Sequence, residues 1–161
     1  MGKMPDPWFR AQAFAGPMYG MDSRKPDRDL LPGERILGPF ILPPFQRPPV
    51  WSQEQRTALV ESLWDGVPIG AYVVNQTTLG NPCDQWLLDG QQRIGAILGY
   101  IRGEFPVYGH LFTDLDRPEQ LGFLMRPLAY LETNIETEAH CRLVYNRLAF
   151  GGTAHTPDQR A

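Results

Sequence analysis

The chain has 161 residues and a hydrophobic fraction of 42%, which is enough for one domain with a sizeable core. Its net charge of −3 argues against a uniformly basic surface that coats nucleic acid. No apolar run reaches the roughly 18 residues of a membrane span, and no apolar region follows Lys3, so we expect a cytoplasmic protein without a membrane partner. The two cysteines, Cys83 and Cys141, lack the spacing of a zinc site or of a disulfide framework.

The first 32 residues are rich in proline, glycine and charge and show no sustained periodicity. We therefore predict that residues 1–32 are an N-terminal arm and that residues 33–161 form a single domain. The arm carries four aromatic residues, too many for a purely solvated tail: Trp8, Phe9, Phe14 and Tyr19. We expect it to lie across the body or across a second copy of the chain in a homodimer.

The next segments carry clear start and stop signals. Residues 35–42 are predicted to form a strand that ends at Pro43, because proline interrupts strand pairing. Ser52 followed by Gln55 is a capping box, so a helix is expected to begin there and to end at Gly66.

The rest of the chain alternates short strand and helix patterns. Strands are predicted at residues 69–77 and 84–88, which should be a hairpin or near neighbours, and at 105–112 and 128–131; helices are predicted from Pro118 and over 137–150. This mixture indicates an α+β fold with a small mixed sheet and three or four helices.

The most informative segment is QWLLDGQQRIGAILGY. An apolar strand leads into a turn at Asp89 and Gly90, and apolar residues then recur with helical spacing. The helix should begin at Gln91 or Gln92, with Arg93 in its first turn. The first N–H groups of a helix have no partners inside it and carry the positive end of its dipole, so this end suits a phosphate.

A purely structural interpretation of the same turn stays open. Asp89 could cap the helix, Gly90 could serve the turn alone, and Arg93 could pair with a nearby carboxylate. A second candidate segment has the same ambiguity: Gln46 and Arg47 lie between two pairs of prolines, which either hold functional side chains rigidly or form a simple connector.

Three blocks of the sequence resemble one family. The unbroken DGQQR at residues 89–93 resembles the signature of a branch of the ParB/sulfiredoxin-like superfamily, which includes the N-terminal domains of GmrSD-type modification-dependent restriction enzymes. Residues 40–51, FILPPFQRPPVW, followed by GVPIG at 66–70, are similar to its upstream element, and residues 145–156 are similar to its later one. The resemblance covers about residues 34–158.

The resemblance implies a ParB/sulfiredoxin-like domain that binds ATP or GTP with Mg²⁺ at the DGQQR turn. The residues implied as catalytic are Asp89, Arg47, Arg93 and Glu34, with Asp89 also as metal ligand; those implied to bind the nucleotide are Gln46, Gly90, Gln91, Gln92, Arg93 and His155. The only lysines are Lys3 and Lys25, so the body has to hold phosphate with arginine or backbone, and a Walker P-loop is excluded.

We expect a nucleoside-triphosphate-dependent phosphoryl-transfer enzyme acting on DNA, such as a kinase for a hydroxymethyl base, because the sequence contains neither the helical extension nor the nuclease domain of the family. One alternative is an NTPase or nuclease module of a modification-dependent restriction system. Another is a module that binds nucleotide or DNA without catalysis. Contact with DNA should be local, since the net charge is negative.

Overall fold

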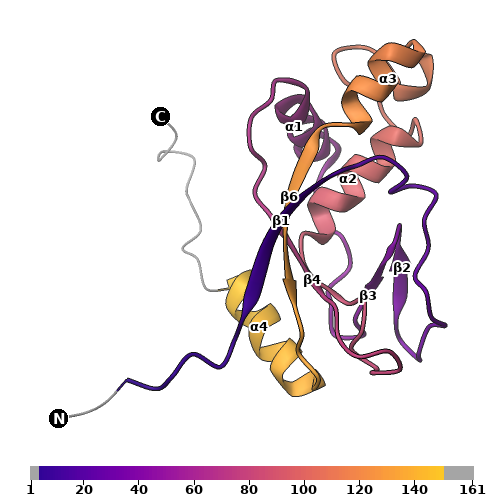
Figure 1. Ribbon diagram of the computed structural model, residues 1–161. Coiled ribbons are helices and arrows are strands. Elements are labelled where there is room, and N and C mark those ends of the chain that lie inside the picture. The colour runs from indigo at the N-terminus through magenta and orange to yellow at the C-terminus, as the bar shows by residue number, and fades with distance from the viewer. Residues whose placement is uncertain (1–3, 151–161) are drawn as a thin grey trace.

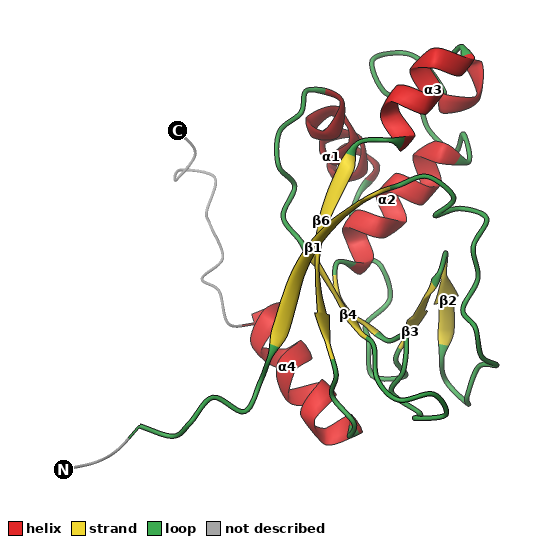
Figure 2. Ribbon diagram, viewed as in Figure 1, coloured by secondary structure: helices red, strands yellow, loops and turns green. Residues whose placement is uncertain are grey.

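The computed structural model describes residues 4–150. Its elements in chain order are β1 (Ala11–Pro17), β2 (Arg35–Leu37), β3 (Phe40–Leu42), α1 (Gln53–Trp64), β4 (Tyr72–Asn75), β5 (Leu87–Asp89), α2 (Gln91–Ile101), a short 3-10 helix (Phe112–Asp114), α3 (Arg117–Leu124), β6 (Pro127–Thr133) and α4 (Glu138–Phe150). Figure 2 separates these helices and strands by colour.

Four strands form one mixed sheet in the order β1-β6-β4-β5. β6 pairs antiparallel with β1 and parallel with β4, and β4 pairs antiparallel with β5. β2 and β3 form a separate antiparallel hairpin. The predicted α+β class, with a small mixed sheet and four helices, is confirmed.

The sheet lies between two apolar clusters, because side chains alternate between its faces. Tyr72 and Val74 point into the larger cluster, which also contains the buried side of α2. Val73, between them, packs in the smaller cluster with Cys141 and Val144 of α4. Figure 1 accordingly shows α4 on one side of the sheet and α2 with the β2–β3 hairpin on the other.

Two predicted helix starts are confirmed, since both depend on local signals. The hydroxyl of Ser52 accepts a hydrogen bond from the backbone N–H of Gln55, whose side chain in turn accepts one from the N–H of Ser52, completing the capping box. The DGQQR helix begins at Gln91, as the apolar spacing predicted. None of the helices in residues 4–150 is long and apolar enough to cross a membrane.

Two strand predictions need correction, and one strand was not predicted. Residues 35–42 form a hairpin with a turn at Gly38 and Pro39 rather than one strand. Residues 105–112 contain only a single bridge, between Val107 and His110. No strand was predicted within the arm, yet residues 11–17 form β1 along the edge of the sheet. Its partner β6 lies far away in the sequence, so local patterns could not reveal the pairing. Association of two chains through this segment stays a prediction.

Candidate functional site

A cavity of about 450 Å³ opens at the N-terminus of α2, and we call it the helix-end pocket. Its lining residues come from five parts of the chain: Gln46, Arg47, Pro48, Val50 and Trp51; Leu59; Ile69; Asp89, Gly90, Gln91, Gln92 and Arg93; and Tyr145 and Ala149. The fold thus brings the proline-walled loop and the DGQQR turn together, as expected. The contribution of α4 was not predicted, because Tyr145 looks like an ordinary core position of a helix and Ala149 like a position on its exposed side.

Gly90 is the N-cap of α2 and has a left-handed backbone with φ of 103°. A Cβ at this position would lie 2.6 Å from Cβ of Tyr72. Glycine is therefore required by the backbone conformation and by the close approach of β4. Gly90 also lines the helix-end pocket.

No side chain of the described residues caps α2, so the suggestion that Asp89 caps this helix is wrong. The first hydrogen bond of the helix runs from the N–H of Ile94 to the carbonyl of Gly90. The N–H groups of the three preceding residues, Gln91 to Arg93, therefore remain available at the positive end of the helix dipole. A helix end left this way favours an anion beside it.

The guanidinium of Arg93 is held in place by two contacts. Its Nη2 lies 2.7 Å from Oδ2 of Asp89, and its Nη1 donates to the carbonyl of Ile69 at 3.2 Å. Gly70 makes room for it, since a Cβ there would lie 2.6 Å from Nη1. This explains the last glycine of the sequence GVPIG. It also answers one open alternative: Arg93 does pair with a nearby carboxylate.

Gln46 and Arg47 enter the pocket from the proline-walled loop. Gln46 is buried, with 7% of its surface exposed, and its Oε1 has no hydrogen-bond partner within residues 4–150. Arg47 is exposed, and its guanidinium carbon lies 4.9 Å from the ring centroid of Phe150 on α4. A buried amide oxygen without a partner costs free energy unless a ligand or water satisfies it.

Gln92 has a positioning role in this structure. Its Oε1 accepts hydrogen bonds from the backbone N–H groups of Val50 at 3.3 Å and Trp51 at 3.2 Å. The side chain therefore ties the end of the proline-walled loop to the start of α2. Gln91 is buried and lines the pocket beside it.

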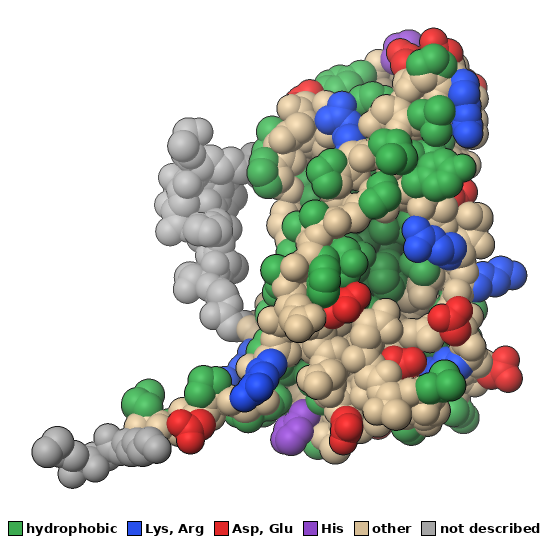
Figure 3. Space-filling model, in the orientation of Figure 1, with side chains coloured by type: hydrophobic (Ala, Val, Ile, Leu, Met, Phe, Trp, Pro, Cys, Tyr) green, Lys and Arg blue, Asp and Glu red, His purple; other side chains and the backbone are tan. Residues whose placement is uncertain are grey.

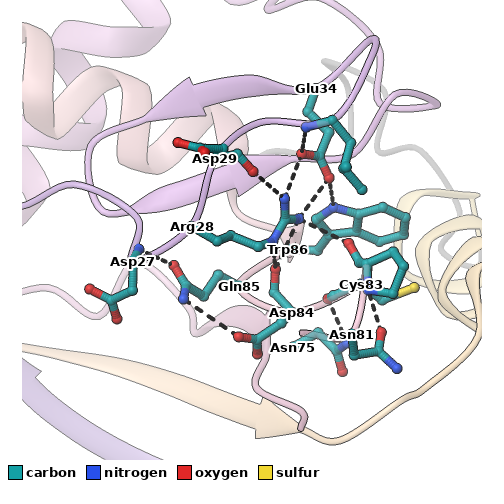
Figure 4. A network of polar contacts seen from close by, with 12 residues as sticks. Asp27, Arg28, Asp29, Glu34, Asn75, Asn81, Cys83, Asp84, Gln85 and Trp86 are labelled. Carbon is teal, nitrogen blue, oxygen red and sulfur yellow. Dashed lines mark hydrogen bonds and ion pairs between the residues drawn. The ribbon is translucent and has the colours of Figure 1, made fainter. Parts of the chain in front are cut away.

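Glu34 does not reach the helix-end pocket. Its buried carboxylate binds the guanidinium of Arg28 through both oxygens, at 2.7 and 2.9 Å, and accepts hydrogen bonds from the N–H of Leu31 at 2.7 Å and from the indole of Trp86 at 2.6 Å (Figure 4). Burial alone would raise the pKa of Glu34, but these hydrogen bonds outweigh it and hold the pKa below its usual value. A carboxylate bound in this way is a structural anchor rather than a base.

The last two residues predicted to bind nucleotide or metal are His155 and Asp89. His155 lies outside the described residues. Within the described part of the chain, no group of three or more His, Cys, Asp or Glu side chains is placed to hold a metal ion. Asp89 is partly exposed, with one carboxylate oxygen on Arg93 and the other without a hydrogen bond from the described residues.

The charged side chains of the pocket are Arg47, Arg93 and Asp89, so positive charge is in excess there although the chain is acidic overall. Together with the free N–H groups of α2 and the amide of Gln46, this is a lining for an anion that also offers hydrogen-bonding groups.

Comparison with known proteins agrees with the motifs. The family model described as "GmrSD restriction endonuclease, N-terminal domain" matches residues 28–150, which include every element from β2 to α4. Neither a curated protein nor a solved structure matches the chain. The matched segment covers well over half of the sequence. The chain therefore belongs to the family of GmrSD restriction endonuclease N-terminal domains.

Proposed function

We propose that this domain binds a nucleoside triphosphate in the helix-end pocket and uses it, by hydrolysis or transfer of the terminal phosphate, within a DNA restriction system. The family description supports the connection with DNA restriction. The observation that supports nucleotide binding is the uncapped N-terminus of α2, which lies in a pocket with excess positive charge. The same pocket contains Oε1 of Gln46, which is buried and has no hydrogen-bond partner in the described residues.

Backbone groups and side chains of the pocket would contact different parts of the nucleotide. The N–H groups of Gln91 and Gln92 would bind phosphate oxygens, because they already point out of the helix without partners. Arg47 and Arg93 would bind further oxygens from two sides, and planar guanidinium groups match the geometry of phosphate. Gln46 would then direct its amide to the sugar or base.

The ion pair of Asp89 and Arg93 could be exchanged for contacts with the nucleotide and the metal. Phosphate competes with the Asp89 carboxylate for the guanidinium, and the freed carboxylate can serve as the single protein ligand that Mg²⁺ often has beside substrate phosphates. Asp89 fits that role, since one of its oxygens already has no hydrogen bond from the described residues. The metal would neutralise charge on the phosphate oxygens, while Arg47 and Arg93 stabilise the charge that develops during transfer.

The deciding experiment follows label from γ-labelled ATP and GTP, with and without unmodified and hydroxymethylated DNA. Label in free phosphate assigns hydrolysis, and label in DNA assigns the kinase reaction that the sequence suggested. Nucleotide that binds without turnover assigns a non-catalytic module. Absence of nucleotide binding overturns the proposal.

The control separates the pocket from general charge effects. Arg93→Ala should abolish binding, whereas Arg102→Ala should leave it unchanged, because Arg102 is exposed at the other end of the same helix. Equal loss in both variants would speak against the helix-end pocket.

A further inference from the structure

A second cavity, of about 400 Å³, lies over the sheet, and we call it the sheet-face pocket. One wall is formed by β1, β6 and β4, and the other by the segment that leads from β1 to the β2–β3 hairpin. Figure 3 shows this hollow over the sheet, with apolar side chains inside and charged ones at its rim. None of its residues belongs to the helix-end pocket.

The sheet-face pocket is lined by Tyr72 and Val74 of β4, whereas no residue of β4 lines the helix-end pocket. Asp89 of the helix-end pocket pairs with Val73, whose side chain packs on the α4 side of the sheet. Tyr72, the preceding residue, points to the other face of the sheet, as the alternation of a strand requires, and lines the sheet-face pocket. A ligand in the sheet-face pocket is therefore recognised separately from the triphosphate.

Aromatic side chains form the floor of the pocket. Tyr130 and Tyr72 come from the neighbouring strands β6 and β4, and their near-parallel rings lie with centroids 5.2 Å apart. Phe14 of β1 continues the row outside the pocket lining, with its ring centroid 5.4 Å from that of Tyr130. Phe40 closes the row edge-on, 5.2 Å from Tyr72. Burial raises the pKa of Tyr72 to about 12, so its hydroxyl stays protonated and can donate a hydrogen bond at neutral pH.

The rim offers opposite charges on its two sides. Glu132 and Gln76 lie beyond the aromatic side chains on the sheet, whereas Arg24, Lys25 and Asp27 lie on the segment that covers it, where the two cations outnumber the one carboxylate. Within residues 4–150, the side chains of Glu132 and Lys25 have no ion-pair or hydrogen-bond partner. Lys25 is the only lysine outside the first three residues, so the rim of this pocket is the one place beyond those residues where a lysine supplies positive charge.

We propose that the sheet-face pocket binds one nucleotide that leaves the base stack of DNA. A base has an apolar ring that can pack against the aromatic side chains of the floor and edge amino groups for Glu132, and its phosphate would lie at Arg24 and Lys25. The cavity is within the range of about 300 to 1,000 Å³ that small-ligand pockets have, so it holds a single nucleotide and excludes a duplex. This inference takes one element from the proposed function, namely that the substrate is DNA.

A larger side chain in place of Gly16 would fill the sheet-face pocket. It lines the cavity from the edge strand β1, and a Cβ there would meet only the ring of Tyr130, at an ordinary 3.7 Å. Gly16→Leu should therefore fold and fill the cavity. Ala15→Leu is the matched control, because Ala15 is exposed and points to the opposite face of the same strand.

The test measures the Kd of a short single-stranded oligonucleotide by fluorescence anisotropy. Gly16→Leu should weaken binding by about tenfold or more, as expected for the loss of one base–aromatic contact, and Ala15→Leu should leave it unchanged. Glu132→Gln should remove a preference for cytosine or adenine over thymine, since only the former carry amino groups, whereas Glu136→Gln should keep it.

Two results would overturn the inference: no binding of oligonucleotide by the unaltered protein, or equal affinity in the Gly16→Leu and Ala15→Leu variants. Binding of ATP and GTP is measured on the same proteins. Loss of triphosphate binding with intact oligonucleotide binding would contradict the proposed function alone, because the two pockets share no residue.

Discussion

The carboxylate of Asp89 lies 2.7 Å from the guanidinium of Arg93, one helical turn further along, so these two charges of the helix-end pocket neutralise each other. The pair closes the turn between β5 and α2 without capping the helix. A phosphate bound at Arg93, as proposed, would compete with Asp89 for the guanidinium.

This relationship makes Asp89→Asn informative. The pair is partly exposed, so its loss should lower the free energy of unfolding by less than about 1 kcal/mol. Without Mg²⁺, the variant should bind ATP at least as tightly as the unaltered protein, because a competing negative charge is removed. If Asp89 holds the metal, phosphoryl transfer should fall at least about a hundredfold, the low end of contributions from a catalytic group. Full turnover by a folded variant would exclude Asp89 from the chemistry.

Arg47→Lys tests whether the proline-walled loop acts through charge or through geometry. The lysine keeps the positive charge but loses the planar guanidinium that faces Phe150. We expect kcat to fall more than nucleotide affinity, because a planar clamp on phosphate gains strength in the transition state. Steady-state kinetics with separate Kd measurements check this. Equal kcat in both proteins would limit Arg47 to a general electrostatic role.

Gly90→Ala should destabilise the fold itself. The variant places a methyl group against Tyr72 and forces alanine into φ of 103°, a combination of clash and backbone strain that costs on the order of 1 to 3 kcal/mol. Urea denaturation measures the loss. Gly95→Ala is the matched control inside the same helix: nothing lies within 4 Å of its added Cβ, and stability should rise by about 0.5 to 1 kcal/mol.

The lowered pKa of Glu34 predicts that the free energy of unfolding depends on pH. Its pKa is lower in the folded than in the unfolded protein, so the stabilisation is complete above the unfolded value of about 4.3 and is lost as the pH falls through the folded value. Glu34→Gln at neutral pH leaves Arg28 unpaired and should cost about 3 to 5 kcal/mol, nearer the lower figure because the guanidinium also donates to backbone carbonyls.

The control for this prediction is Glu104→Gln. Glu104 pairs with Arg56 on the surface, with about half of its side chain exposed, so the change should cost less than about 1 kcal/mol. Denaturation curves at several pH values should show the difference between the unaltered protein and Glu34→Gln shrinking in acid. A difference that stays constant down to pH 3 would contradict an ionised Glu34 as the anchor.

The sequence by itself determined the elements whose signals are local. The capping box of Ser52 and Gln55 placed the start of α1, and the apolar spacing after Gly90 placed the start of α2. Both depend on residues within one helical turn, where hydrogen bonding and periodicity are readable from neighbours. The DGQQR and QR motifs likewise identified the two segments that form most of the helix-end pocket.

Only the tertiary structure decided what depends on contacts between distant segments. β1 exists because β6 offers it a pairing edge, and Glu34 is an anchor because Arg28 and Trp86 surround it. The sheet-face pocket likewise needs β1, β6 and β4 in register to bring Gly16, Tyr130 and Tyr72 together. Such pairings are selected by burial and hydrogen bonding of the whole chain, which no local pattern encodes.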